Sequence, residues 1–191
     1  MINEIEKYAK DNNIPIMLKD GIEFLEEYIK KNNIKKILEI GSAIGYSAIK
    51  MALVSDDIRV TTIEKDKIRY EQAVYNISKL NLNTRIKIIN EDALNINLTD
   101  EYDLIFIDAA KSQYINFFKM FSKNLKDNGV IISDNLNFHG YVNNVEQIKN
   151  RNLRQLVRKI NEYINFLKNN EEFSTIFLNI GDGIGISKQK K

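Results

Sequence analysis

Residues 37–45 read Ile-Leu-Glu-Ile-Gly-Ser-Ala-Ile-Gly, and this stretch decides the fold. The short apolar run predicts a buried strand at Lys36–Ile40. Gly41 and Gly45 predict a tight turn that leads into a helix at Ser47–Leu53. Such a turn lets a ligand come close to the backbone and presents N–H groups at the start of a helix. The stretch therefore predicts a ligand-binding α/β domain.

Short apolar runs and longer amphipathic stretches alternate along the rest of the chain. This alternation predicts a parallel sheet with helices on both faces. Further strands are expected at Ile58–Ile63, Ile86–Ile89, Leu104–Ile107 and Val130–Ile132, and further helices at Ile2–Lys10, Gly21–Lys31, Lys67–Leu80, Tyr114–Leu125 and Leu153–Leu167. Phe173–Leu178 and Gly183–Ser187, joined by Asn179–Asp182, predict a closing hairpin. A turn is expected at Asp127–Gly129, and Pro15 is expected to end the first helix.

Length and composition limit the class of protein. The 191 residues predict one domain, with helices in residues 1–34 covering the site and a core in residues 35–191. The absence of cysteine excludes disulfides and thiolate metal sites. The N-terminus lacks the apolar core of a signal peptide, and no apolar run reaches the roughly 18 residues of a membrane span. We therefore expect a cytoplasmic protein without a membrane partner.

The glycine spacing and the acidic residues around it narrow the choice of ligand. Dinucleotide folds have G-x-G-x-x-G after the strand, whereas this chain has G-x-x-x-G preceded by Glu39. A carboxylate there would repel a pyrophosphate and attract the ammonium of a methionine moiety, which disfavours a nicotinamide dehydrogenase. Glu64 ends the second strand, where acidic residues of nucleoside-binding α/β folds bind ribose hydroxyls. Asp92 follows the third strand, where it is expected to meet an adenine amino group. The alternative is that these glycines and acidic residues are generic features of strand ends in α/β folds and bind no ligand.

Oxygen ligands end the next two strands. Asp108 follows the fourth strand, and Asp134 and Asn135 follow the fifth. Because the carboxyl ends of parallel strands meet at one edge, these side chains are expected to converge on Mg²⁺ or another divalent cation. A lone aspartate at a strand end is otherwise often a helix N-cap. Lys111 is either a solvated charge or, beside a cation, a base that has lost its proton.

Three segments together resemble the metal-dependent O-methyltransferases related to catechol and caffeoyl-CoA O-methyltransferases. They are Leu38–Ser47, Phe106–Lys111 and Asp134-Asn135, and the resemblance covers nearly the whole chain. It implies the class I fold that binds S-adenosylmethionine (SAM): a doubly wound, Rossmann-like, mostly parallel seven-stranded sheet with a C-terminal antiparallel hairpin. It implies a cofactor shell of Met17, Glu39, Gly41, Ser42, Ser47, Glu64, Asp92, Ala93 and Asp108. It also implies Asp108, Asp134 and Asn135 as metal ligands, with Lys111 and Asp108 as catalytic residues.

Within that family the chain is most similar to bacterial tRNA 5-hydroxyuridine methyltransferases. Segments that match in order are Tyr8-Ala9-Lys10, Ile14–Met17, Ala43–Ile49, Asp134–Gly140 and Gly181–Gly183. The similarity implies methylation of 5-hydroxyuridine at the tRNA wobble position, an anticodon-loop partner and a homodimer. Family members usually carry a further segment before the Tyr8 helix, and Met1 lies almost directly before it here, so lid closure and dimer geometry are not carried over.

RNA binding has candidate residues of its own. Arg151, Arg154 and Arg158 share one helical face, which is either a phosphate-contacting strip or a solvated surface. Phe138, His139 and Tyr141 either stack on a base or pack against the core. With the same site, the chain is alternatively a small-molecule catechol or caffeoyl-type O-methyltransferase. A non-catalytic RNA-binding protein on a degenerate methyltransferase fold is disfavoured by the joint presence of the metal ligands and Lys111.

Overall fold

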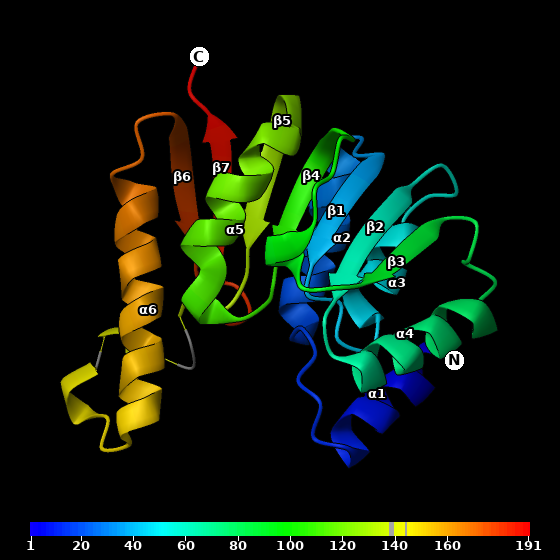
Figure 1. Cartoon of the computed structure of the whole chain (residues 1–191), viewed down its shortest axis with the longest axis horizontal. Coiled ribbons are helices and arrows are strands. Elements are labelled where there is room, and N and C mark those ends of the chain that lie inside the picture. Colours follow the sequence, from blue (N-terminus) through cyan, green and yellow to red (C-terminus); the bar gives the residue numbers. More distant parts are fainter. Residues whose placement is uncertain (138–139, 144) are drawn as a thin grey trace.

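A seven-stranded sheet forms the centre of the molecule (Figure 1). The computed structural model describes residues 1–137, 140–143 and 145–191. The strand order is β3-β2-β1-β4-β5-β7-β6. The strands are β1 (Lys36–Ile40), β2 (Arg59–Glu64), β3 (Ile86–Asn90), β4 (Tyr102–Ile107), β5 (Leu125–Ser133), β6 (Phe173–Leu178) and β7 (Ile184–Gln189). The first five are parallel, and β7 is antiparallel to both β5 and β6. The predicted mostly parallel sheet with a C-terminal antiparallel hairpin is confirmed.

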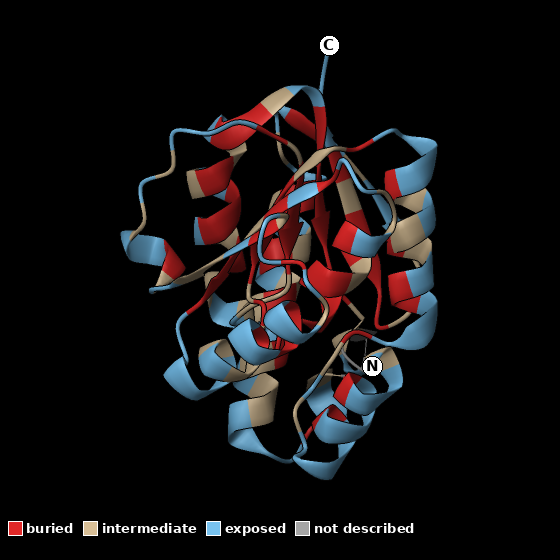
Figure 2. Ribbon diagram, turned by 90° about the vertical axis from the view of Figure 1, so that its right-hand side faces the viewer, coloured by how far each residue is buried: buried red, intermediate tan, exposed pale blue. Residues whose placement is uncertain are grey.

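Helices cover both faces of the sheet, as predicted. They are α1 (Ile2–Asp11), α2 (Lys19–Lys31), α3 (Tyr46–Leu53), α4 (Lys67–Lys79), α5 (Tyr114–Phe121) and α6 (Arg151–Lys168). Successive strand residues point to opposite faces, so Phe106 joins the apolar core shared with α1–α4 and Ile107 joins the core shared with α5 and α6. Figure 2 shows buried residues in the sheet and on the helix faces that look towards it. No helix in the described ranges is long and apolar enough to cross a membrane.

The region between α5 and β5 corrects the predicted boundaries. The helix expected at Tyr114–Leu125 ends at Phe121, and a short 3₁₀ turn covers Ser122–Asn124. The Asn124 side chain donates hydrogen bonds to the carbonyls of Leu98 and Asp100, which holds the chain against the loop before β4. Strand β5 then starts at Leu125, earlier than expected, because Leu125 pairs with Tyr102.

Two predicted chain breaks also differ from the structure. Asp127–Gly129 lies inside the span of β5, where its register with β4 shifts and Asn128 takes a positive φ of 63°. Helix α1 ends at Asp11, before Pro15, because Asn13 takes a left-handed conformation with φ 51°. Asparagine tolerates this conformation better than most residues. In both places an asparagine with a positive φ redirects the backbone, inside the span of a strand at Asn128 and after a helix at Asn13.

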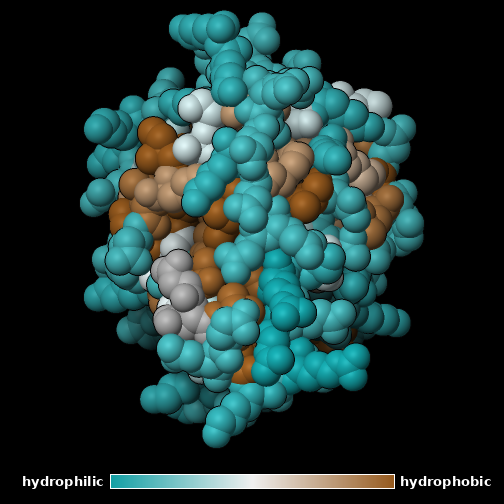
Figure 3. All heavy atoms as spheres, turned by 90° about the vertical axis from the view of Figure 1, so that its left-hand side faces the viewer, coloured by the Kyte–Doolittle hydropathy of each residue, from teal (hydrophilic) through white to brown (hydrophobic). Residues whose placement is uncertain are grey.

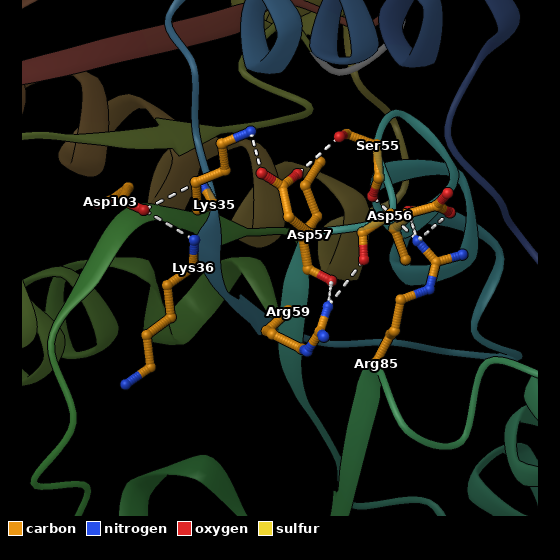
Figure 4. Close-up of polar contacts among 10 residues, drawn as sticks. Lys35, Lys36, Ser55, Asp56, Asp57, Arg59, Arg85 and Asp103 are labelled. Atoms are coloured by element: carbon orange, nitrogen blue, oxygen red, sulfur yellow. Dashed lines mark hydrogen bonds and ion pairs between the residues drawn. The ribbon is translucent and has the colours of Figure 1, made fainter.

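Polar contacts connect neighbouring strands at the edge of the sheet where the parallel strands begin (Figure 4). One carboxylate oxygen of Asp103 accepts hydrogen bonds from the backbone N–H groups of Lys35 and Lys36, at 3.0 and 2.7 Å, and so joins β4 to β1. The Lys35 ammonium forms an ion pair with Asp57, just before β2, at 2.6 Å. These contacts of charged side chains connect the starts of β1, β2 and β4. The opposite edge of the sheet carries the cavity described below.

Candidate functional site

A cavity of about 650 Å³ lies at the carboxyl ends of the parallel strands. This is the edge at which open α/β sheets bind ligands, and the volume is within the usual range for small-molecule sites. Most of the residues predicted from the sequence line it, namely Met17, Gly41, Ser42, Ser47, Glu64, Asp92, Ala93, Asp108, Lys111 and Asn135. Residues Pro15–Leu18, between α1 and α2, form part of the wall, so this segment is the part of residues 1–34 that borders the cavity.

The glycine turn has the tight backbone that its sequence predicted. Gly41 and Gly45 have φ values of 94° and 81°, and Ala43 between them also has a positive φ of 46°. A side chain at Gly41 would bring its Cβ to 2.3 Å from the carbonyl oxygen of Asp108, because the turn packs directly against the end of β4. The Ser42 hydroxyl is buried and has no hydrogen-bond partner among the described residues. A buried polar group without a partner is costly, so this hydroxyl fits a hydrogen bond to a bound ligand.

Glu64 supports the glycine turn as well as lining the cavity. One of its carboxylate oxygens accepts a hydrogen bond from the backbone N–H of Ala43, and the other accepts one from Asp66, both at 2.8 Å. The Glu64 side chain is thus already oriented at the place where a ribose is expected. Asp92 accepts a hydrogen bond from the N–H of Leu94 at 3.0 Å, which caps a short 3₁₀ turn beside the cavity.

Glu39 lies behind the cavity wall, not in it. Its side chain is 0% exposed, and its two oxygens accept hydrogen bonds from the hydroxyls of Ser47 and Thr62, the latter at 2.5 Å. Burial, reinforced by the nearby charges of Asp108 and Glu64, raises the pKa of Glu39 to about 7. Direct contact with the cofactor ammonium stays a prediction. Thr62 was not identified from the sequence, because a threonine inside a strand carries no signal of such a contact.

Glu39→Gln is expected to flatten the pH dependence of stability. Glu39 has a folded pKa of about 7 and an ordinary value of 4.5. Its contribution to stability is therefore complete below pH 4.5 and is lost as the pH rises through 7. At 1.36 kcal/mol per pKa unit the loss is at most about 3 kcal/mol. Urea unfolding at pH 5 and pH 8 measures it, with Glu101→Gln as an exposed control. Equal pH slopes in Glu39→Gln and the natural chain would contradict the expectation.

The predicted metal ligands converge where β4 and β5 end. The Asp134 backbone N–H donates to the carbonyl of Ile107, and the Asn135 side-chain amide donates to a carboxylate oxygen of Asp134 at 3.1 Å. Asp134 is 2% exposed, and its Oδ1 atom has no hydrogen-bond partner among the described residues. Burial, followed by the charge of Asp108, raises the pKa of Asp134 to about 7. Two carboxylates and an amide oxygen, one of them an unpaired buried acceptor, fit a hard divalent cation.

The backbone of Asn135 has a positive φ of 61°. Strained residues of this kind persist where the surrounding structure holds them, and they are frequent at functional sites. Asparagine suits the position because it adopts the left-handed region more readily than most residues and supplies an oxygen ligand as well. Asn135 thus fits this position both because it tolerates the left-handed backbone conformation and because its side chain carries an oxygen that can bind a cation.

Lys111 and Tyr114 lie between the ends of β4 and β5, beside the predicted metal ligands. The Lys111 ammonium donates hydrogen bonds to Asp108 and to the Tyr114 hydroxyl, both at 2.8 Å, and the Tyr114 hydroxyl donates to the Asp134 carbonyl at 3.2 Å. These contacts connect the end of β4 to the end of β5. Burial raises the pKa of Tyr114 well above its ordinary value. Tyr114 is not among the residues predicted from the sequence, although its position three residues after Lys111 places both on one side of a helical turn.

The three arginines predicted to contact RNA differ in their surroundings, and RNA binding by them stays a prediction. Arg151 and Arg158 are exposed on α6, but the Arg154 guanidinium donates two hydrogen bonds, at 2.9 and 2.6 Å, to the carbonyl of Ile148. Arg154 therefore holds the loop before α6. Figure 3 shows hydrophilic side chains together with apolar patches on the side of the molecule that carries α6. Of the aromatic candidates, Tyr141 is exposed, and Phe138 and His139 lie outside the described residues.

Comparison with known proteins agrees with this arrangement. The sequence profile of the O-methyltransferase family matches residues 1–190. A caffeoyl-CoA O-methyltransferase of Populus kitakamiensis is 30% identical over 193 residues, which cover 96% of this chain and 82% of the relative. A Staphylococcus aureus structure, provisionally named a caffeoyl-CoA O-methyltransferase, is 39% identical with a TM-score of 0.94 and covers 99% of this chain and 92% of its own.

A third relative was solved with a ligand. The O-methyltransferase of Bacillus cereus, in complex with SAH, is 26% identical with a TM-score of 0.84, and the match covers 99% of this chain and 90% of that one. The family match extends over nearly the whole sequence, and the solved relatives share the fold. The chain therefore belongs to the O-methyltransferase family.

Proposed function

We propose that this chain transfers the methyl group of S-adenosylmethionine to one of two vicinal oxygens on a small, catechol-like substrate, assisted by a divalent cation. The observation that carries this proposal is the set of residues that line the cavity. The glycine turn and Glu64 line the same cavity as Asp108, Lys111 and Asn135. Groups suited to a nucleoside cofactor and groups suited to a cation therefore border one space, as cation-assisted methyl transfer requires.

The cofactor end of the cavity is built from the chain's own polar groups. The Ser42 hydroxyl would bond to the amino-acid part of the cofactor, and Glu64 would bond to its ribose. Met17 and Ala93 are buried apolar residues that would pack beside the adenosine part. The presence of SAH in the structure of the Bacillus cereus relative supports a cofactor of this class.

The metal end would bind and activate the substrate. Asp108, Asp134 and Asn135 would hold the cation, whose positive charge, when bound, favours the ionised form of a substrate hydroxyl. Lys111, after releasing its own proton to solvent while the cation is bound, would accept the hydroxyl proton at its amine nitrogen. The substrate oxygen then forms a bond to the methyl carbon while the carbon–sulfur bond breaks and its electron pair stays on sulfur. The negative charge of the substrate oxygen and the positive charge of the sulfonium cancel in this step. The step is therefore favoured in a buried cavity that excludes water.

Methylation of tRNA stays a prediction, and the small-molecule reaction is the better supported of the two. The Populus relative is named for a small-molecule substrate. Of the three arginines expected to contact RNA, Arg154 already donates to the Ile148 carbonyl. A homodimer and a cytoplasmic location also remain predictions.

A competition between two substrates tests the proposal. The purified chain is incubated with labelled S-adenosylmethionine, Mg²⁺ and either caffeoyl-CoA and simple catechols or tRNA from cells that lack this gene. We expect methylated catechol products, detected by mass spectrometry, and no label in tRNA. The appearance of 5-methoxyuridine in the tRNA without catechol products would replace the small-molecule function by the tRNA function. Asp134→Asn serves as the inactive control for both substrates.

A further inference from the structure

The turn between β6 and β7 places an additional carboxylate beside the predicted metal ligands. Asp182 is 6% exposed and lines the same cavity as Asp108 and Asn135. Because Gly185 of β7 pairs with Ser133 at the end of β5, the Gly181-Asp182-Gly183 turn lies at the edge of the sheet where the parallel strands end. The residues around Asp182 predict only a hairpin turn, so the fold gives Asp182 a position that its local sequence does not indicate.

One side of this turn is held against the loop that follows the metal ligands. The backbone N–H groups of Leu136 and Asn137 donate hydrogen bonds to the carbonyls of Gly183 and Asp182, at 2.9 and 2.7 Å. Gly183 has a φ of 88°, and a Cβ there would lie 2.5 Å from the nitrogen of Asn137. The close approach requires glycine, and it fixes Asp182 relative to Asp134 and Asn135.

The other side of the turn is held by the start of α2. One carboxylate oxygen of Asp20 accepts a hydrogen bond from the N–H of Gly181, and the other accepts one from Gly21, both at 3.0 Å. A Cβ at Gly181 would lie 3.2 Å from the Cα atom of Gly21, so the two glycines let the backbones meet. The position of Asp182 therefore depends on a contact with the N-terminal helices.

The position of Asp182 relates it to the predicted metal ligands. Its backbone carbonyl accepts a hydrogen bond from Asn137, three residues after Asp134, and Asp182 lines the cavity together with Asn135. Asp134 also holds a buried carboxylate oxygen without a hydrogen-bond partner among the described residues. A divalent cation held at this edge would be attracted by each further carboxylate nearby, because opposite charges attract strongly where water is largely excluded.

We propose that Asp182 is an electrostatic member of the divalent-cation site, positioned by Asp20 through the Gly181-Asp182-Gly183 turn. This inference rests on the proposed metal-assisted function. Asp182 adds negative charge beside Asp108 and Asp134 and thereby raises the affinity of the edge for a divalent cation. Outer groups that support metal ligands typically change metal affinity by about 10- to 100-fold.

Calorimetric titration of the full chain with Mg²⁺ or Mn²⁺, without substrate, tests the inference. Asp182→Asn keeps the shape of the side chain and is expected to weaken cation binding about 10-fold. Asp182→Glu keeps the charge and is expected to bind within about threefold of the natural chain. Asp20→Ala leaves every proposed ligand in place and is expected to weaken binding as well, because it releases the turn. Asp100→Asn makes the same change of charge at the opposite edge of the sheet and is expected to have no effect.

The outcomes separate this inference from the proposed function. If the natural chain binds no divalent cation, the metal-assisted function fails and the inference fails with it. If the natural chain binds the cation and Asp134→Asn abolishes binding, an unchanged affinity in a folded Asp182→Asn overturns the inference alone. Equal weakening in Asp182→Asn and Asp100→Asn also overturns it, because net charge would then account for the effect. Thermal unfolding of each variant establishes that it is folded.

Discussion

Asp134→Asn is expected to abolish methyl transfer and, in the absence of metal, to stabilise the folded chain. The substitution preserves the shape of the side chain and removes one of the two carboxylates in the predicted ligand set. A cation held there stabilises developing charge by several kcal/mol. Because 1.36 kcal/mol corresponds to a tenfold change in rate, we expect a decrease in kcat of about 1000-fold. The rate is measured with saturating S-adenosylmethionine and Mg²⁺.

The gain in stability has a separate physical cause. Asp134 is buried beside Asp108, its Oδ1 atom has no hydrogen-bond partner among the described residues, and its pKa is raised to about 7. The folded chain thus holds this charge at a cost, and a neutral amide lowers that cost. We expect the free energy of unfolding at pH 8, without metal, to rise by about 1 to 2 kcal/mol. A variant that is both less stable and fully active would contradict both assignments.

Lys111→Met is expected to lower kcat by about 100- to 10,000-fold, the range typical of a lost general base. The affinity for S-adenosylmethionine, measured by calorimetry, is expected to change little. The structure adds a second role to be separated from the first, because the Lys111 ammonium also forms an ion pair with Asp108 at 2.8 Å. Loss of this charge could by itself alter cation binding.

Lys111→Arg separates the two roles of Lys111. Arginine keeps a positive charge beside Asp108 but does not lose its proton under ordinary conditions. If Lys111 accepts the substrate proton, both variants are expected to be slow while Lys111→Arg binds Mg²⁺ like the natural chain. Recovery of kcat in Lys111→Arg would show that the charge alone matters. A kcat near that of the natural chain in Lys111→Met, at saturating Mg²⁺, would remove Lys111 from the mechanism.

Much of the fold was predictable because it depends on short-range patterns. The apolar runs predicted the cores of β1 to β5, and the alternation of strands and helices predicted the parallel sheet. The exceptions lie where a long-range contact outweighs the local pattern. Leu125, read as the end of a helix, begins β5 because it pairs with Tyr102.

The candidate site divides in the same way. The sequence by itself determined the residues at the strand ends, such as Glu64, Asp108 and Asp134, because parallel strands bring their carboxyl ends to one edge. The tertiary structure alone decided that Glu39 lies behind the cavity wall and that Arg154 bonds to the Ile148 carbonyl.

Asp182 shows the physical reason most clearly. Its neighbours in sequence are two glycines, which indicate a turn and nothing more. Its place beside Asp134 results from the pairing of β7 with β5, and from backbone hydrogen bonds to Leu136 and Asn137. Local sequence patterns indicate how each segment folds. They indicate functional residues only where the topology gives those residues a known place, such as the edge at which parallel strands end. Contacts between segments far apart in the sequence depend on how the elements pack, and so only the tertiary structure placed this carboxylate at the site.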